Sequence, residues 1–369
     1  MKITPTPRSI DIALTKECNL RCSYCAHFTS PTDVALDLPT GEWLTFFQEL
    51  NACGIISVCL QGGEVFCRKD LIEIIKGICD NKMRFSILTN ATLINESAAE
   101  FIAKTKRCNY IQVSIDGQNA EVHDATRGKG SFIKILKGLN ILRQYNLPVS
   151  ARVTINKNNL YHIEAVAHFL LEDLRFESFS TNSACYQGMC RKNADSLQLD
   201  INDRSYAMQK FLNLSKKYPG RIFATAGPLA DVFWWLNIID KVKSNNNREG
   251  GNLSGYLGGC SGIFNTMAVR ADGVMVPCLL MSHIELGRIN KDSLKEVWQH
   301  HPEMQRLRLR GKIPLSNFEF CKDCIYISYC TGGCPAVTYN LLGTDCHPDP
   351  TICLKRFLEQ GGILPHSLR

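Results

Sequence analysis

The stretch Cys18-Asn19-Leu20-Arg21-Cys22-Ser23-Tyr24-Cys25 carries three cysteines in the spacing C-x3-C-x2-C. It directly follows an apolar alternating run over residues 9–15, which predicts a first β-strand. Three thiolates crowded onto one loop suit a soft metal ion or an iron–sulfur cluster. A [4Fe–4S] cube takes four ligands, so three cysteines leave one iron open to a small molecule that binds through an amine and a carboxylate. The alternative interpretations are a zinc site, or buried thiols that happen to fall close together.

Size and composition narrow the class of protein. The chain has 369 residues, of which 45% are hydrophobic and 21% charged, so it can bury a full core and is not expected to be disordered. The net charge of +7 is mild and spread out, which argues against nucleic-acid binding. The sequence shows neither a signal peptide nor a run of 18 apolar residues. We therefore expect a cytoplasmic protein without a membrane span.

Eighteen cysteines are many for a chain of this length. In the absence of a signal peptide they indicate metal or redox chemistry rather than disulfides, and they predict an oxygen-sensitive protein. Ten of them fall into recognisable groups. The others lie mostly in apolar surroundings and are expected to be small core residues: Cys53, Cys59, Cys67, Cys79, Cys108, Cys185, Cys190 and Cys346.

The first 217 residues alternate between predicted strands and predicted helices. The predicted strands are 9–15, 56–61, 85–89, 110–115, 149–155 and 176–181. The predicted helices are 41–52, 70–80, 95–104, 131–145, 159–171 and 203–217. Apolar strands joined by short connections favour an α/β fold, with both faces of a parallel sheet covered and the sheet curled into a partial (β/α)6 TIM-type barrel. Ligands bind such sheets at the carboxyl ends of the strands.

Polar residues follow several of these predicted strands. After the second strand, Gly62 and Gly63 allow a turn whose backbone approaches a ligand closely, and the Glu64 carboxylate can hold an ammonium group. The third strand ends before Asn90. The fourth ends in Val113-Ser114-Ile115-Asp116-Gly117, which also fits a simple turn with a capping aspartate.

A charge interrupts the fifth predicted strand at Arg152. Such a charge is costly inside a barrel unless it is paired. Arg127 is expected in a loop, and Asn182 follows the sixth strand. Residues 183–256 show no clear strand alternation, so we expect a helical bridge over 218–256 that ends in a surface loop.

A second cysteine-rich region begins at Cys260. It runs Cys260-x12-Gly273-x4-Cys278, then Cys321-x2-Cys324-x5-Cys330-x3-Cys334, and it closes with Cys353. The Asp272-Gly273 pair within alternating apolar residues predicts a β-hairpin over 266–276. Viewed alone, the four-cysteine cluster also fits a zinc knot.

Taken together, these motifs resemble two known families. The three-cysteine loop, with the aromatic Tyr24 before its last cysteine, resembles the radical S-adenosylmethionine (SAM) enzymes. Gly62-Gly63-Glu64 is similar to their GGE motif, although Val65 replaces the proline that usually follows. The seven later cysteines resemble the SPASM domain. The resemblance implies a partial barrel over 1–217, the bridge over 218–256 and a SPASM domain over 257–369.

The resemblance implies three [4Fe–4S] clusters. Cys18, Cys22 and Cys25 would hold the SAM-binding cluster. The first auxiliary cluster would take Cys260, Cys278 and Cys334, and the second would take Cys321, Cys324, Cys330 and Cys353. The fourth position of the first auxiliary cluster is expected to be open or filled by Cys346, which is also an alternative to Cys353 in the second.

The resemblance also implies contacts to SAM. Glu64 would hold the amine, Ser114 would contact the cofactor, and Arg152 would meet the carboxylate, with Arg127 as a lesser candidate. Asn182 would line the adenine pocket. The remaining expected contacts are Tyr24, Gly62, Gly63, Asn90 and Asp116.

In function, the resemblance implies reductive cleavage of SAM to a 5′-deoxyadenosyl radical that removes hydrogen from a substrate. The substrate is expected to be a ribosomally made peptide that becomes crosslinked, as in the pyrroloquinoline-quinone maturases. Residues 278–287 look most like the relatives of these maturases in the SynChlorMet cassette. Sulfatase maturases carry an aspartate where this chain has Leu279, which counts against that activity.

The expected function implies protein partners, and two alternative functions also fit the sequence. About eight residues precede the first strand, so a peptide substrate would need a separate small leader-binding protein. Flavodoxin or ferredoxin would supply electrons. The first alternative is a radical SAM dehydrogenase or epimerase of a small molecule, with Cys185 or Cys190 as hydrogen-atom donor. The second is a zinc protein without enzymatic activity.

Overall fold

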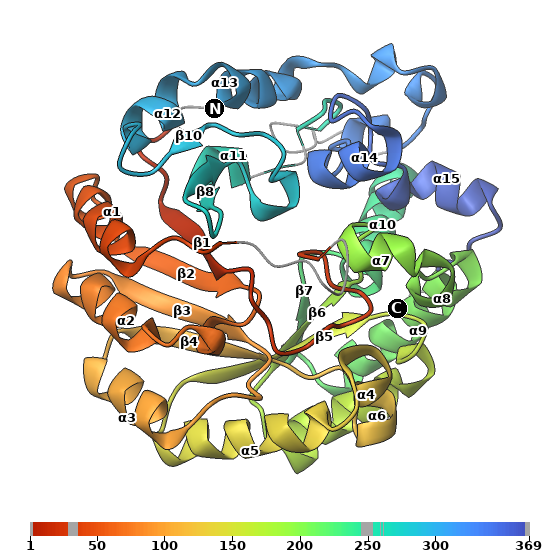
Figure 1. Ribbon diagram of the computed structural model, residues 1–369. Helices are drawn as coiled ribbons and strands as arrows, with labels where there is room; N and C mark the ends of the chain where they lie inside the picture. Colours follow the sequence, from red (N-terminus) through yellow and green to blue (C-terminus); the bar gives the residue numbers. More distant parts are fainter. Residues whose placement is uncertain (1–2, 29–35, 245–253, 259, 261, 366–369) are drawn as a thin grey trace.

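Seven parallel strands, β1 to β7, form the N-terminal part of one ten-stranded sheet in this computed structural model. The structure describes residues 3–28, 36–244, 254–258, 260 and 262–365. The sheet runs in the order β10-β9-β8-β1-β2-β3-β4-β5-β6-β7. Figure 1 shows α1, α2, α3 and α5 along its outer side, with the C-terminal elements α12 to α15 above it.

The strands are short, as expected for a curled parallel sheet. They are β1 (Ser9–Thr15), β2 (Ser57–Gly62), β3 (Arg84–Thr89), β4 (Cys108–Ser114), β5 (Val149–Ile155), β6 (Phe179–Ser183), β7 (Ile222–Ala224), β8 (Thr266–Val269), β9 (Val274–Val276) and β10 (Gly287–Arg288).

Helices connect consecutive strands of the barrel. Those before β8 are α1 (Thr40–Ala52), α2 (Leu71–Asp80), α3 (Glu96–Thr105), α4 (Ala120–Arg127), α5 (Ser131–Gln144), α6 (Ile163–His168), α7 (Gly188–Lys192), α8 (Ala194–Leu197), α9 (Ile201–Lys217), α10 (Pro228–Lys243) and α11 (Gly262–Asn265). Those after β10 are α12 (Leu294–His300), α13 (Pro302–Leu309), α14 (Pro335–Leu342) and α15 (Leu354–Glu359).

The two faces of the barrel sheet differ in polarity. Side chains such as Ile12 and Ile87 point outward and are fully buried in a core shared with the covering helices. The alternate positions, such as Asp11 and Arg152, are polar and only partly buried. The prediction of two apolar, covered faces is therefore wrong for the inner face, which keeps polar groups in contact with solvent. A ligand that binds inside the barrel meets these groups.

The cysteine-rich region extends the same sheet. Strand β8 pairs in parallel with β1, in a register that sets Ile10 opposite Met267, and β9 returns antiparallel to β8. The predicted hairpin over 266–276 is therefore confirmed. The Trp298 indole N–H also donates to the Thr4 carbonyl at 2.9 Å, which fastens α12 to the start of the chain.

The partial barrel and the α/β class are confirmed, with some differences in elements. Strand β7 was not predicted, and it adds a seventh strand to the expected six. Helix α4 occupies a segment expected to be a loop. The predicted helix over 159–171 is divided into a 3₁₀ turn η2 (Leu160–His162), α6 and a π-helical segment η3 (Phe169–Asp173). The expected surface loop before Ser254 lies outside the described residues.

In the described part of the chain, none of the helices combines the length and the apolar character that crossing a membrane requires. The division into domains at residues 217 and 257 stays a prediction.

Candidate functional site

The loop with the first three cysteines leaves the carboxyl end of β1 and is held from two sides. The Ser23 N–H donates to the Thr126 carbonyl of α4 at 2.9 Å. On the other side, the Met189 N–H of α7 donates to the Cys25 carbonyl at 2.8 Å, and the Asn193 amide donates to the Ser23 carbonyl at 2.9 Å. These backbone contacts fix where the three thiols lie relative to the barrel.

The thiols of Cys18, Cys22 and Cys25 are partly buried and free of disulfides. Burial raises the pKa of Cys18 to about 12 and that of Cys22 to about 11, and the neighbouring thiols add to the rise, Cys22 and Cys25 at Cys18 and Cys25 at Cys22. Burial likewise raises the pKa of Cys25. Thiolates in such a place need a strong positive charge beside them, which an iron–sulfur cluster supplies. The donor set therefore fits the cluster that the sequence implied.

The glycines after β2 pack against this loop. The Gly63 N–H donates to the Thr15 carbonyl at 2.7 Å, and a Cβ on Gly63 would lie 2.1 Å from the Glu17 carbonyl oxygen. A Cβ on Gly62 would lie 2.4 Å from the Thr15 carbonyl oxygen. Both positions thus require glycine because the protein's own backbone lies close to them. The prediction had given the close approach of a ligand as the reason.

Glu64 is 1% exposed and ties the turn to the end of β3. Its carboxylate accepts hydrogen bonds from the Thr89 hydroxyl at 2.6 Å and from the Asn90 N–H at 2.7 Å. Burial raises the pKa of Glu64, and these hydrogen bonds oppose the rise. A carboxylate has further acceptor positions, so the contact with the SAM amine stays a prediction.

Asn90 connects the end of β3 with the cysteine loop. Its amide nitrogen donates to the Asn19 side-chain oxygen at 3.0 Å and lies 3.8 Å from the sulfur of Cys18. The predicted site residue Asn90 is therefore next to a predicted cluster ligand, and the end of β3 meets the end of β1.

Asp116 is fully buried and gathers several partners. One carboxylate oxygen accepts from the Tyr24 hydroxyl at 2.5 Å and from Nε of Arg127 at 2.5 Å, and the other accepts from the Thr154 N–H at 2.7 Å. Arg127 also contacts the Tyr24 hydroxyl. Tyr24 and Asp116 are therefore joined to each other, while their contact with SAM stays a prediction.

The expectation of a loop at Arg127 is wrong, since this residue ends α4 and is buried. The strong ion pair raises its pKa against the effect of burial. Sequence reasoning placed Arg127 below Arg152 because a polar segment between two turns gave no sign that one of its charges would be buried.

Ser114, Arg152 and Asn182 lie on neighbouring strands. Ser114 is opposite Arg152 in the register of β4 and β5. A guanidinium nitrogen of Arg152 lies 3.4 Å from the Gln112 side-chain oxygen, and no carboxylate of the described residues lies within 4.0 Å of it. The Asn182 side-chain oxygen is buried without a hydrogen-bond partner among the described residues. Arg152 and Asn182 thus offer polar groups that a charged, hydrogen-bonding ligand such as SAM fits.

The seven later cysteines separate into two groups. Burial and then the charges of Cys260 and Cys334 raise the pKa of Cys278 to about 12. The second group shows the same effect, because burial and then the charges of Cys330, Cys353 and Cys324 raise the pKa of Cys321. These groups correspond to the two sets that the resemblance implied, and the role of their members as cluster ligands stays a prediction. Among the described residues, no three histidine, cysteine or acidic side chains are placed around a single metal ion.

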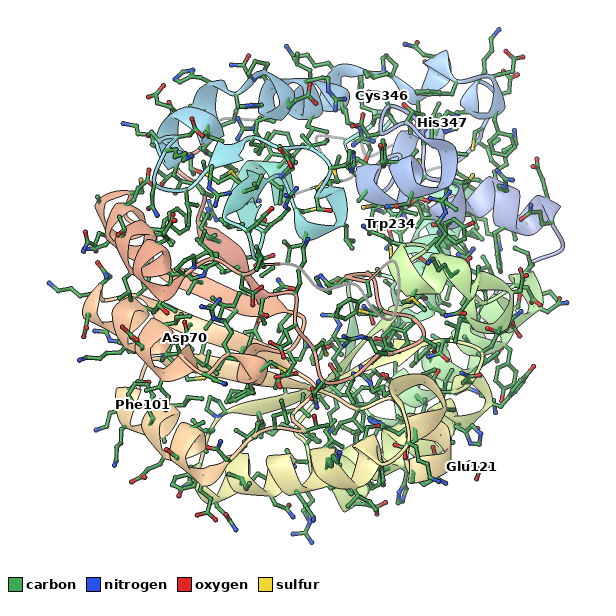
Figure 2. All side chains as sticks on the ribbon, viewed as in Figure 1. Asp70, Phe101, Glu121, Trp234, Cys346 and His347 are labelled. Atoms are coloured by element: carbon green, nitrogen blue, oxygen red, sulfur yellow. The ribbon has the colours of Figure 1, made fainter. Side chains whose placement is uncertain are left out.

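Cys346 lies among charged side chains. Its sulfur is 3.6 Å from a nitrogen of Arg306 and 3.2 Å from an oxygen of Asp345. Figure 2 shows Cys346 beside His347 in the C-terminal part of the chain. Cys353, in contrast, interacts with the thiols of the second group. This placement favours Cys353 over Cys346 in the second set, as the resemblance implied.

Cys185 and Cys190 differ in exposure. Cys190 is fully buried, whereas Cys185 is partly buried and lies near Cys334. The Gln187 amide near Cys185 donates to the Leu280 carbonyl at 3.4 Å, so this segment reaches from the first cysteine loop to the second cysteine region. A fully buried thiol is poorly placed to meet a substrate, so Cys185 is the more accessible of the two predicted hydrogen-atom donors.

Two segments of the chain match known families. Residues 12–170 match the radical SAM superfamily, and residues 260–325 match SPASM, an iron–sulfur cluster-binding domain. The chain belongs to the radical SAM superfamily. The SPASM match contains Cys260, Cys278, Cys321 and Cys324, so this radical SAM protein also carries the second cysteine region that the sequence predicted.

Relatives of this radical SAM/SPASM protein extend over nearly its whole length. The AdoMet-dependent heme synthase of Methanosarcina barkeri is 27% identical over 366 residues, which cover 96% of this chain and 98% of the relative. The PqqA peptide cyclase of Bradyrhizobium diazoefficiens is 23% identical over 96% of this chain and 88% of its own. The structure of Streptococcus suis SuiB bound to precursor peptide SuiA matches with a TM-score of 0.71 and 17% identity, over 95% of this chain and 77% of SuiB. This likeness confirms the fold of the radical SAM/SPASM chain.

Proposed function

We propose that this radical SAM enzyme oxidatively modifies a ribosomally made precursor peptide. When bound, SAM and three [4Fe–4S] clusters would supply a 5′-deoxyadenosyl radical that removes a hydrogen atom, and an acceptor for the electron left on the product. The observation that carries the proposal is the contact of the Asn90 amide with Asn19 and Cys18, because it sets the cysteine loop against the polar strand ends. A peptide cyclase among the relatives supports the choice of a peptide.

The chain's own residues would position the reactants. Arg152 would pair with a carboxylate, and Ser114 and Asn182 would hydrogen-bond the cofactor beside it. Glu64 would accept from the SAM amine with the acceptor positions that Thr89 and Asn90 leave free. The core between the sheet and its covering helices would keep water away from the outer face of the sheet, opposite the face that binds the ligand.

The contribution of Arg152 is measured by SAM binding to the anaerobic protein. Arg152→Gln is expected to weaken SAM affinity about tenfold or more, because the ligand carboxylate loses a charged partner. The matched control is Arg84→Gln, at the opposite end of the sheet and exposed, which should leave the affinity unchanged. Equal affinities of the two variants would remove Arg152 from the SAM site. Glu64→Gln tests the amine contact in the same assay.

A second candidate is the oxidation of a small molecule. The heme synthase relative favours it, since that similarity covers both chains almost completely. A porphyrin would be the substrate class in that case. Cys185 would matter most for an epimerase, which returns a hydrogen atom to its substrate.

The deciding experiment supplies the reconstituted enzyme with SAM, dithionite and one class of substrate at a time. Precursor peptides from neighbouring reading frames should stimulate formation of 5′-deoxyadenosine and lose hydrogen atoms by mass spectrometry. Stimulation by an iron porphyrin alone would favour the second candidate. Uptake of deuterium from the solvent would identify epimerisation. Absence of 5′-deoxyadenosine under all conditions would contradict both candidates.

Two partners belong to the proposal. A small leader-binding protein would present the peptide, and pull-down with the precursor tests for it. Flavodoxin or ferredoxin would replace dithionite as the electron donor, and either should support turnover in the same assay.

A further inference from the structure

Arg310 is a buried charge, and two of its nitrogens have no hydrogen-bond partner in the part of the chain that the structure describes. It begins the short 3₁₀ helix η5 (Arg310–Lys312) after α13, and it is 1% exposed. Its Nε and Nη2 atoms are buried, and no described residue accepts a hydrogen bond from them. Such groups are rarely left unpaired, because burying a charge without a counter-charge is strongly unfavourable.

The carboxylate of Asp345 does not provide the missing hydrogen bonds of Arg310. Asp345 acts on Arg310 through its charge, but its oxygens accept hydrogen bonds from Arg306 at 2.7 Å each and none from the Nε and Nη2 atoms of Arg310. The other anionic groups that act on Arg310 are thiols, namely Cys346, Cys260 and Cys334. Two of these belong to the first auxiliary ligand set. Hydrogen bonds agree with this placement, because the Leu257 N–H donates to the Ile313 carbonyl at 3.0 Å and Nε of Arg308 donates to the Ile263 carbonyl at 3.0 Å, so residues on both sides of Cys260 lie against α13 and η5. The guanidinium therefore lies near the place where that cluster would be held.

Arg308 is a useful comparison, because it is also buried but has hydrogen-bond acceptors for part of its guanidinium. It lies two residues earlier and is 8% exposed, yet its guanidinium donates to the Ile263 carbonyl at 3.0 Å and to the Trp298 carbonyl at 2.6 Å. It also packs over the Trp298 ring, 4.4 Å from the centroid. Burial alone shifts its pKa, and no cysteine acts on it. Two nitrogens of Arg308 therefore bind backbone carbonyls and its Nη2 atom alone is buried without a partner among the described residues, whereas both Nε and Nη2 of Arg310 are.

We propose that Arg310 is the hydrogen-bond donor and counter-charge of the first auxiliary cluster, the one assigned to Cys260, Cys278 and Cys334. A thiolate-bound [4Fe–4S] cluster carries net negative charge that increases on reduction, and charge and hydrogen bonds to its sulfurs set its potential. A fixed guanidinium beside it stabilises the reduced state and raises the reduction potential. This inference rests on the proposed function, because it needs an auxiliary cluster at these cysteines.

A raised reduction potential would suit the first auxiliary cluster as an electron acceptor. A cluster with a raised potential holds an added electron more readily, which an oxidative modification requires. Near the second auxiliary set, an arginine acts on the thiol of Cys353, but this residue, Arg356, is exposed to solvent and its charge is therefore screened. The two auxiliary clusters should therefore differ in potential, with the first one higher.

The test is a potentiometric titration followed by electron paramagnetic resonance. The full chain carries alanine at Cys18, Cys22 and Cys25, so that the two auxiliary clusters alone contribute. Arg310→Gln keeps some donors but loses the charge, and it should lower one of the two potentials by about 59 mV or more, a tenfold change in the equilibrium, while the other stays constant. Arg310→Lys, which keeps the charge, should shift that potential much less. Arg308→Gln should move neither.

Two unchanged potentials in an Arg310→Gln protein that retains its iron would overturn the proposal. If substitutions at Arg310 cost iron, the unsubstituted residue is tested instead, with ¹⁵N-labelled arginine and hyperfine spectroscopy. Coupling of an arginine nitrogen to a reduced auxiliary cluster supports the proposal, and absence of that coupling overturns it. A parent protein with no iron in the second cysteine region would contradict the proposed function itself, which iron analysis shows before any titration.

Discussion

The Nε atom of Arg127 lies 2.5 Å from a carboxylate oxygen of Asp116, and neither side chain is more than 7% exposed. This ion pair joins the end of α4 to the residue just beyond β4. The Tyr24 hydroxyl binds the same oxygen, so the pair also holds the cysteine loop in place. The ion pair is thus a structural connection between the barrel and the first cluster site.

Removal of Arg127 should destabilise the protein. Arg127→Met leaves the fully buried Asp116 carboxylate without its counter-charge, which costs about 3–5 kcal/mol for comparable buried pairs. Denaturant unfolding of the anaerobic protein measures this loss. The control is Lys104→Met, which breaks the exposed pair with Glu100 and should have no measurable effect. A similar stability of both variants would show that the buried pair is dispensable.

Gly63→Ala should displace the first cysteine loop. The added methyl group would lie 2.1 Å from the Glu17 carbonyl oxygen, so the turn and the loop cannot keep their present distance. We expect lower thermal stability and loss of iron from the first site, measured by calorimetry and iron analysis. Gly41→Ala is the matched control, because nothing lies within 4 Å of its added Cβ and alanine is favourable in α1. Full iron retention by Gly63→Ala would contradict the tight packing described here.

His123 should make stability depend on pH. It is fully buried, and its Nδ1 atom accepts the Asp116 N–H at 3.2 Å, which requires a neutral ring. Burial and then the charge of Arg127 lower its pKa to about 4. Between that value and the ordinary histidine pKa the unfolded chain binds a proton that the folded one excludes, so stability falls as the pH falls. The loss from about pH 6.5 to pH 5 should be about 1.5 kcal/mol.

The measurement compares denaturant unfolding at these two pH values for the wild type and for His123→Asn. The amide oxygen of asparagine can replace Nδ1 as acceptor but does not titrate, so its pH dependence should be shallower. His300→Asn, at an exposed residue, should keep the wild-type dependence. Identical slopes for all three proteins would exclude His123 as the source.

Alanine at Cys18, Cys22 and Cys25 together should abolish cleavage of SAM yet leave iron in the second cysteine region. The two regions use separate thiols, and the second region is also held by contacts away from the first cysteine loop, such as the packing of Phe357 on Trp235 of α10. Product analysis for 5′-deoxyadenosine and iron counting check the two halves of this expectation. Cys53→Ala, at a partly buried thiol after α1, serves as the control. Continued formation of 5′-deoxyadenosine by the triple variant would refute the assignment of the first cluster.

The elements that sequence reasoning found are those with a local signal. Strands β1 to β5 are apolar runs, and the hairpin β8–β9 turns at Asp272-Gly273. These patterns can be recognised from residues that are neighbours in the sequence. Helix α4 was missed because its buried face includes His123 and Arg127, polar residues whose burial depends on Asp116. Strand β7 was missed because three residues are too few to show a pattern.

The residues of the candidate site also differ in whether the local sequence indicates their role. Spacing was enough to group Cys18, Cys22 and Cys25, since thiols on one short loop lie close together, whereas the division of the seven later cysteines into two sets came from the resemblance to the SPASM domain. Arg310 gave no such signal, because the segment Arg306-Leu307-Arg308-Leu309-Arg310 reads as an ordinary basic stretch. Whether a charge is solvated or buried there depends on α13 and η5 packing beside Cys260 and Cys334, which lie far away in the sequence.

The parallel pairing of β8 with β1 has a consequence for shortened versions of the chain. A protein cut before Thr266 would leave the apolar strand β1 as an open sheet edge, with backbone groups ready to bind a strand of another molecule. Attempts to produce the barrel alone should therefore yield aggregates, for reasons unrelated to iron or oxygen.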